Sequence, residues 1–219
     1  MHNDNNQALP VVIIGAGPVG LAAAAQVLAR GMTPLVFESG PAVGHALRQW
    51  AHIRMFSPWE YNIDREAAAL LADTGWSAPE PTGFPTGGEL VARYLEPLAA
   101  TPALAPHLHF GARVTAVAKH GRDLMKNADR DALPWQVRHE TVAADGSVVE
   151  HDVLACAVID ASGTLASPNP IGASGIPARG ERAARARIAY GMPDVLGGAR
   201  GRYAGKRVLV VGSGHSAFN

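Results

Sequence analysis

The sequence lacks several features by which other classes of protein are recognised. It has one cysteine in 219 residues, which excludes an internal disulfide and a paired-cysteine redox or zinc site. Its 19 basic and 19 acidic residues cancel, so no net charge draws it to nucleic acid or to an anionic membrane. The longest apolar runs, such as residues 153–159, fall far short of the roughly 18 residues of a membrane-spanning helix. Because the polar first residues do not form a signal peptide, we expect a soluble cytoplasmic protein.

What the sequence does contain begins with a strand, a glycine-rich turn and a helix. Val11–Ile14 is a continuous apolar run, typical of a strand buried on both faces, and it ends at Gly-Ala-Gly-Pro-Val-Gly. Residues 19–30 are rich in alanine and predict a helix, which Gly31 terminates as a C-cap glycine. Residues 33–38 predict a second strand that ends on an acid. This β-α-β unit of about 30 residues predicts a parallel sheet.

The glycine spacing of this unit is that of a dinucleotide-binding site. Gly15 allows the tight turn, Gly17 lets a diphosphate approach the backbone, and Gly20 lets the helix pack closely on the strand. The phosphates would lie at the positive helix N-terminus, which Pro18 and Val19 begin. The Glu38 carboxylate would accept hydrogen bonds from the ribose hydroxyls and would repel a 2′-phosphate. This first site is therefore predicted to exclude NADP and to accept either NAD or FAD.

The remaining chain adds an antiparallel insertion and a second glycine motif. A capping box of Thr86 and Glu89 predicts a helix over residues 87–99, and an antiparallel hairpin is expected over 135–141 and 147–153. Residues 154–159 predict a buried strand that contains Cys156 as a small apolar side chain. Residues 207–211 predict a further strand, which opens into a second glycine turn. Two dinucleotide motifs in one chain favour FAD at the first, because a second motif would be redundant if the first held the nicotinamide.

These motifs make the sequence resemble the two-dinucleotide-binding flavoproteins, and within them the flavin-containing monooxygenase-like group and its disulfide oxidoreductase relatives. The resemblance implies FAD at the first motif, where Ser39 follows the ribose acid. It also implies FAD contacts at positions that match Arg48, Trp50, Val114, Ala161, Ser162 and Gly163. The second motif would bind NADPH or NADH through Gly212, Gly214 and Ser216. A surface salt bridge is the alternative for Arg48, and aromatic packing is the alternative to a flavin contact for the loop at residues 56–62.

The expected fold is α/β: a Rossmann-like FAD-binding domain with a parallel sheet and an antiparallel insertion, followed by the start of a second Rossmann motif. The predicted divisions are a polar tail (1–8), the FAD-binding domain (9–166), a connector (167–205) and the first strand and turn of a truncated NAD(P)-binding domain (206–219). Only five residues follow Gly214, so we expect a fragment that lacks the rest of that domain.

The activity that the resemblance implies is an FAD-dependent, NADPH-dependent monooxygenase. Hydride would pass from NADPH to FAD, and the reduced flavin would use dioxygen to oxygenate a small molecule. The histidine of the monooxygenase fingerprint is missing between Gly180 and Tyr190, which leaves two alternatives open. These are a flavin reductase that does not oxygenate, and a catalytically silent dinucleotide-binding module. The sequence holds no metal site and no hydrolase triad.

Overall fold

Two β-sheets form the frame of the protein. The computed structural model describes residues 9–165, 167–172 and 174–218. A parallel sheet has the strand order β3-β2-β1-β7, and an antiparallel sheet has the order β4-β5-β6. The parallel strands are β1 (Val11–Ile14), β2 (Pro34–Glu38), β3 (Leu108–Phe110) and β7 (Ala157–Asp160). The antiparallel strands are β4 (Arg113–Lys119), β5 (Trp135–Val142) and β6 (Val148–Ala155), which confirms the predicted hairpin.

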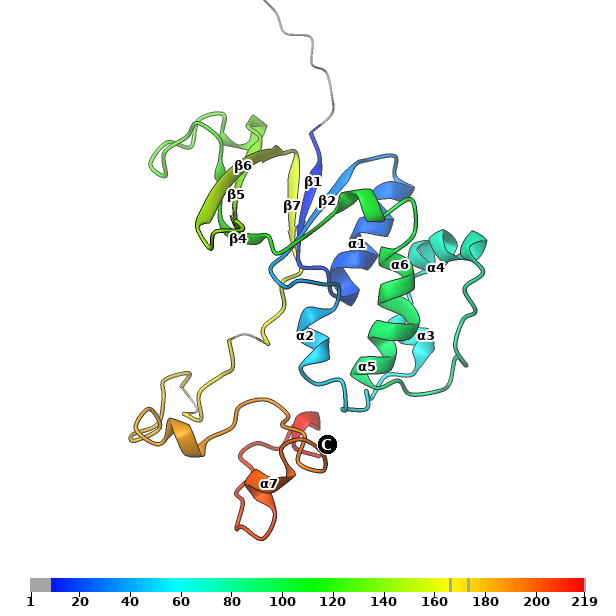
Figure 1. The fold of residues 1–219 in the computed structure, drawn as a ribbon. Coiled ribbons are helices and arrows are strands. Elements are labelled where there is room, and N and C mark those ends of the chain that lie inside the picture. The colour runs from blue at the N-terminus through cyan, green and yellow to red at the C-terminus, as the bar shows by residue number, and fades with distance from the viewer. Residues whose placement is uncertain (1–8, 166, 173, 219) are drawn as a thin grey trace, which may run out of the picture.

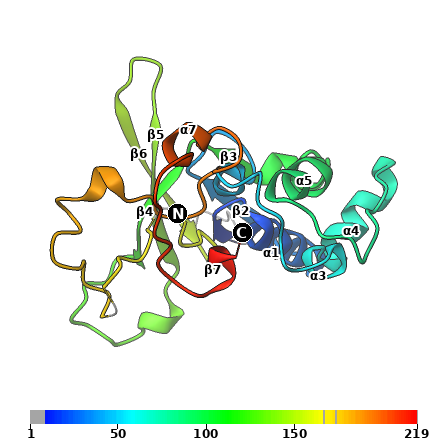
Figure 2. The same ribbon diagram turned by 90° about the horizontal axis from the view of Figure 1, so that it is seen from below.

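The helices of residues 18–99 lie on one side of the parallel sheet, and the antiparallel sheet lies on the other, while the short helix near the C-terminus lies apart from both (Figures 1 and 2). The helices are α1 (Pro18–Ala29), α2 (His45–Arg48), α3 (Trp59–Asn62), α4 (Arg65–Leu71), α5 (Gly87–Leu90), α6 (Glu96–Ala99) and α7 (Arg200–Tyr203). Helix α1 ends as expected, because Gly31 follows it with φ +71°. This mixed arrangement confirms the predicted α/β class.

The helix expected at residues 87–99 forms as a continuous helical segment, with a π-helical turn at Val91–Leu95 between α5 and α6. Its capping box is present: Thr86 Oγ1 accepts from the Glu89 N–H at 3.1 Å, and Glu89 Oε2 accepts from the Thr86 N–H at 2.7 Å. The side chains that face the core are at most 2% exposed, namely Leu90, Val91, Tyr94, Leu95 and Leu98. Burial of this apolar stripe fixes the helix beside α1 and α4.

A small second core joins the two sheets. It consists of Val12, Phe37, Ala112, Val137 and Ala155, none more than 3% exposed. The prediction of one continuous strand over residues 154–159 is wrong, because the chain leaves β6 at Ala155 and enters β7 at Ala157. Cys156 lies at this change of sheet and is exposed, so its predicted burial is also wrong. Its N–H donates to the Pro10 carbonyl at 3.0 Å, which holds the crossover against the start of β1.

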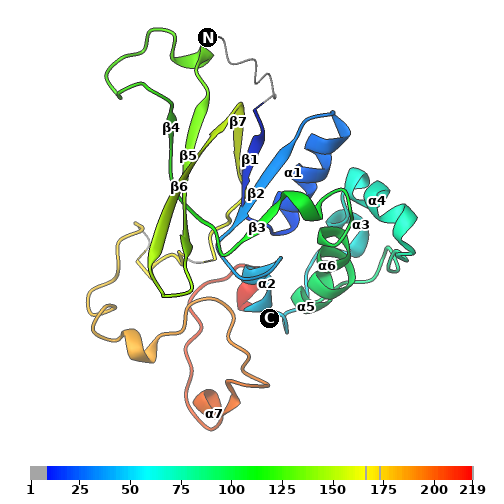
Figure 3. The ribbon, with the colours of Figure 1, turned by 45° about the horizontal axis from the view of Figure 1, so that its top comes forward.

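The predicted strand at residues 207–211 does not form. Val208, Leu209, Val210 and Val211 are between 55% and 86% exposed. An apolar parallel strand is stable only when neighbouring strands pair with it and helices cover both of its faces. Within the described residues no strand pairs with this segment, so it follows an irregular path. The final residues pass close to α2 (Figure 3), where the His215 ring lies 4.6 Å from that of Phe56.

Candidate dinucleotide-binding site

The glycine turn after β1 has the geometry that its sequence predicts. Gly15 has φ +100°, and a Cβ there would lie 2.7 Å from the Ala161 carbonyl oxygen. A Cβ on Gly20 would lie 1.9 Å from the Gly15 carbonyl oxygen, so only glycine allows α1 to pack this closely on the turn. A Cβ on Gly17, by contrast, would meet nothing within 4 Å. The turn is therefore closed on the protein side and open on the side that a ligand would approach.

The N-terminus of α1 offers backbone donors to that open space. Pro18 occupies the first helical position and has no N–H. The first helical hydrogen bond runs from the Leu21 N–H to the Gly17 carbonyl at 3.0 Å. Among the described residues, no acceptor is recorded for the N–H groups of Gly17, Val19 and Gly20. Unpaired amides at the positive end of a helix dipole attract anions, and phosphate above all.

Glu38 at the end of β2 points towards the glycine turn. Its Oε2 accepts from the Ala16 N–H at 2.9 Å, and its Oε1 accepts from the Gly40 N–H at 2.7 Å. The Ser39 hydroxyl lies 3.4 Å from the same Oε1. These backbone bonds hold the carboxylate beside the turn. The remaining oxygen lone pairs can accept from a diol.

A third edge of the site follows β7. The Ala161 N–H donates to the Ile14 carbonyl at 2.9 Å, so this segment runs beside the glycine turn. Asp160 Oδ1 accepts from the Ser162 hydroxyl at 2.6 Å and from the Ser162 N–H at 3.0 Å. The hydroxyl bond, and then the N–H bond, hold the pKa of Asp160 below its ordinary value. Gly163 then turns the chain away with φ +70°. The structure thus brings Ala161, Ser162 and Gly163 to the first glycine motif.

Arg48 and Trp50 lie in and after the short helix α2, which is tied to the turn by a hydrogen bond from the Gly44 N–H to the Ala16 carbonyl at 2.9 Å. Arg48 forms a salt bridge with Glu96 at 2.7 Å, which is the alternative that the sequence left open. Trp50 packs against Gly87, and its indole N–H is buried with no hydrogen-bond partner among the described residues. A buried donor without an acceptor is costly, and a bound ligand oxygen would satisfy it.

Val114 lies in β4, at the irregularity where the register with β5 shifts, and packs against the second core. The preceding segment follows the end of β2, because the Ala112 N–H donates to the Glu38 carbonyl at 2.9 Å and the Gly111 N–H donates to the Gly40 carbonyl at 2.9 Å. Sequence reasoning missed Gly40 as part of this site. The sequence clue is a glycine two residues after Glu38. In the structure a Cβ at this position would lie 2.3 Å from the His45 ring.

The second glycine motif is not assembled in the same way. Gly212 has φ +127°, and Gly214 precedes a single 3₁₀ turn at His215–Ala217. Gly212, Gly214 and Ser216 are exposed and lie beside no strand among the described residues. The strand predicted to open into this turn is therefore not formed. The described residues hold no cluster of three metal-ligating side chains, and none of their helices is long and apolar enough to span a membrane.

Together these features define an α/β protein with a Rossmann-like dinucleotide-binding domain. The family of NAD(P)-binding Rossmann-like domains matches residues 13–77, which contain the turn, α1 and Glu38. The indole-3-pyruvate monooxygenase YUCCA1 of Oryza sativa subsp. japonica is 30% identical over 209 residues. The match covers 94% of this chain and 43% of the relative, so the chain spans less than half of that protein.

Two solved structures of flavin monooxygenase and disulfide reductase type are also similar to this chain. The bacillithiol disulfide reductase Bdr of Bacillus cereus is 26% identical with a TM-score of 0.53, over 75% of this chain and 42% of that one. An oxidised steroid monooxygenase bound to NADP is 25% identical with a TM-score of 0.50, over 78% of this chain and 28% of that one. The chain is thus similar to flavin monooxygenases and to a disulfide reductase, and the predicted resemblance to this group of flavoproteins is confirmed.

Proposed function

We propose that residues 9–166 bind FAD in an NADPH-dependent flavin oxidoreductase of the monooxygenase type. The observation that carries this proposal is the Glu38 carboxylate, held 2.9 Å from the Ala16 N–H beside the unpaired amides of α1. A carboxylate next to an anion site suits a nucleotide that has a free ribose diol. The open space at Gly17 and the unpaired Trp50 indole N–H also fit a bound cofactor.

In this proposal each part of the chain has one task. The N–H groups of Gly17, Val19 and Gly20 bind the diphosphate, and Glu38, with Ser39 beside it, binds the ribose hydroxyls. Ala161, Ser162 and Gly163 line the edge of the site at β7, and Val114 supports it from β4. The second motif, through Gly212, Gly214 and Ser216, contributes to a site for NADPH or NADH. When bound, the flavin accepts hydride from the nicotinamide and reacts with dioxygen.

In this proposal the substrate is a small molecule, because the similar proteins are named as monooxygenases of indole-3-pyruvate and of steroids. YUCCA1 and the steroid monooxygenase support oxygenation as the outcome. The similarity to a disulfide reductase supports the second candidate, a flavin reductase that does not oxygenate. These 219 residues contain a single cysteine, Cys156, and so hold no redox pair of cysteines themselves. The ratio of oxygenated product to peroxide formed per NADPH separates the two candidates.

The test is a titration of the chain with FAD, monitored by flavin fluorescence. It is carried out in the absence and in the presence of nucleotide competitors. ADP shares the adenosine and diphosphate groups of FAD, and we expect it to displace FAD. 2′-Phosphoadenosine 5′-diphosphate is ADP with an added 2′-phosphate, which Glu38 would repel, so we expect it to compete at least tenfold more weakly than ADP. Glu38→Gln should reduce this discrimination while it weakens FAD binding. Equal competition by both nucleotides, or no saturable FAD binding, would refute the proposal.

A further inference from the structure

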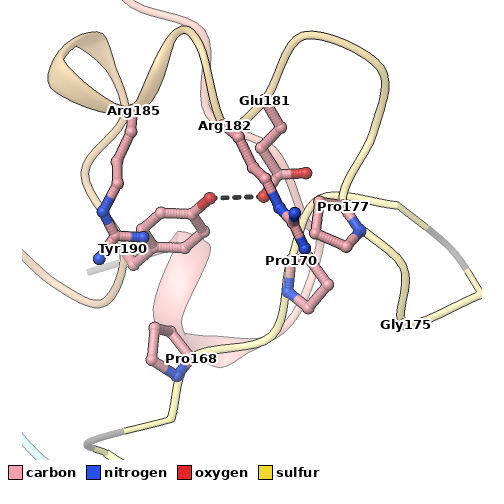
Figure 4. A pocket seen from close by; sticks show the side chains of 8 residues that line it. All are labelled: Pro168, Pro170, Gly175, Pro177, Glu181, Arg182, Arg185 and Tyr190. Carbon is pink, nitrogen blue, oxygen red and sulfur yellow. Dashed lines mark hydrogen bonds between the residues drawn. The ribbon is translucent and has the colours of Figure 1, made fainter.

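A cavity that is open to solvent, with both of its arginines exposed, lies in the connector over residues 168–190. It has a volume of about 370 Å³, within the range of roughly 300–1,000 Å³ that small-molecule sites occupy. Pro168, Pro170 and Pro177 form rigid apolar walls, and the ring of Tyr190 closes one side (Figure 4). Arg182 and Arg185 complete the lining. None of these residues belongs to the proposed nucleotide site.

The cavity is organised around one buried carboxylate. Glu181 is 5% exposed and accepts from the Ala178 N–H at 2.6 Å and from the Ile171 N–H at 3.1 Å. It also accepts from the Tyr190 hydroxyl, and this bond is the main cause that lowers the pKa of Glu181. One side chain thus joins Ile171, Ala178 and Tyr190 of the connector. Because its oxygens are engaged by these donors, Glu181 is a fixed negative part of the wall.

The two arginine side chains of the cavity, unlike that of Glu181, have no hydrogen-bond or ion-pair partner among the described residues. No acceptor within hydrogen-bond distance is recorded for the guanidinium of Arg182 or Arg185 in the described residues, and no carboxylate lies within 4.0 Å of either. Arg185 lies over the Tyr190 ring at 5.7 Å, and Arg182 lies on the other side of the cavity beside Pro170 (Figure 4). Two guanidinium groups and one ionised Glu181 leave a net charge of +1 at the cavity.

We propose that this cavity binds a small carboxylate whose body is a flat ring. The single net positive charge matches a monoanion better than a dianionic phosphate. A guanidinium binds a carboxylate through two parallel hydrogen bonds, which orient the ligand as well as hold it. The proline walls and the Tyr190 ring offer an apolar surface to the ring of the ligand. The proposal is independent of FAD binding, because it uses neither the glycine turn nor Glu38.

The test is calorimetric titration of the 219-residue chain with benzoate, and with benzyl alcohol and inorganic phosphate for comparison. Benzoate is expected to bind at one site. Benzyl alcohol, which keeps the ring and loses the charge, and phosphate, which keeps a charge and loses the ring, are each expected to bind at least tenfold more weakly. Arg182→Gln and Arg185→Gln are expected to weaken benzoate binding at least tenfold each.

The matched control is Arg179→Gln, which removes the same charge from the same segment but does not line the cavity. It is expected to leave benzoate affinity within twofold, and thermal unfolding of each variant shows that the connector remains intact. Equal losses in the three arginine variants would mean general charge attraction and would overturn the proposal. Absence of benzoate binding, or binding of phosphate as tight as that of benzoate, would overturn it as well.

Discussion

Two glycines of one motif are expected to fail in different ways when each is replaced by alanine. At Gly17 an added Cβ meets nothing within 4 Å, and the backbone angles of φ −83° and ψ −172° suit any residue. Alanine is a poorer N-cap than glycine, which destabilises the folded protein. It also reduces the conformational entropy of the unfolded chain, which stabilises the folded protein by about 0.4–1 kcal/mol. Gly17→Ala should therefore change the free energy of unfolding by less than about 1 kcal/mol, or the Tm by less than about 4 °C.

At Gly20 the same methyl group has no space. It would lie 1.9 Å from the Gly15 carbonyl oxygen and 2.9 Å from the carbonyl carbon, so α1 must move away from the turn. Overpacking of a core costs about 1–3 kcal/mol, and a backbone neighbour that cannot rotate away places this case at the upper end. Gly20→Ala should lower the Tm by about 6–12 °C, since about 1 kcal/mol shifts the Tm of a chain of this size by 2–4 °C.

Binding of FAD then separates the two variants. In Gly17→Ala the methyl group projects into the space proposed for the diphosphate, so FAD affinity should fall at least tenfold in a fully folded protein. The matched control is Gly201→Ala in α7, where an added Cβ also meets nothing within 4 Å, and it should bind FAD normally. Calorimetry gives the Tm values, and flavin fluorescence gives the affinities. Normal FAD binding by Gly17→Ala would refute the assignment of this turn to the diphosphate.

Three further substitutions test the surrounding structure. Asp64→Ala should cost about 1–2 kcal/mol in urea unfolding, because its carboxylate caps α4 through the Glu66 and Ala67 N–H groups; a loss below 0.3 kcal/mol would contradict this. Tyr94→Phe should cost about 1 kcal/mol, because the buried hydroxyl is the acceptor of the Asp64 N–H at 3.1 Å; an unchanged midpoint would contradict it. Burial, and then His151 and His109, lower the pKa of His139 against an opposing effect of Asp152. The unfolded chain therefore takes up the proton first as the pH falls below about 6.5, and stability is lost. His139→Phe should reduce the loss of Tm between pH 7 and pH 5, and a variant of the exposed His120 should not. An unchanged dependence of Tm on pH in His139→Phe would refute this.

The first β-α-β unit was predictable because its sequence signals are local. Gly20 is required by its contact with the Gly15 carbonyl and Gly15 by the segment that follows β7, and the apolar run of β1 is buried as expected. The capping box and the buried face of the helix at residues 87–99 depend equally on spacing alone. The hairpin of β5 and β6 follows from alternation around Asp145 and Gly146.

The errors arise where tertiary contacts decide. Residues 154–159 are uniformly apolar, so their sequence gives no sign that the chain changes sheets at Cys156. The partner of Arg48 lies 48 residues away at Glu96, and spacing could not identify it. Residues 207–211 have strong strand propensity, but propensity alone does not make a strand without neighbours.

The two glycine motifs differ in the structural elements that surround them. The first two glycines have the same spacing in both, with Ala217 in place of the third at the second motif, but among the described residues only the first motif joins a strand, a helix and a carboxylate in one place. At the first motif, Glu38 lies 2.9 Å from the Ala16 N–H and the helix amides are unpaired. At the second, Gly214 precedes one 3₁₀ turn and its neighbours are exposed. We therefore expect nucleotide binding to depend on the assembled strand–helix–strand unit, and we propose that Glu38 rather than the glycine pattern selects the nucleotide.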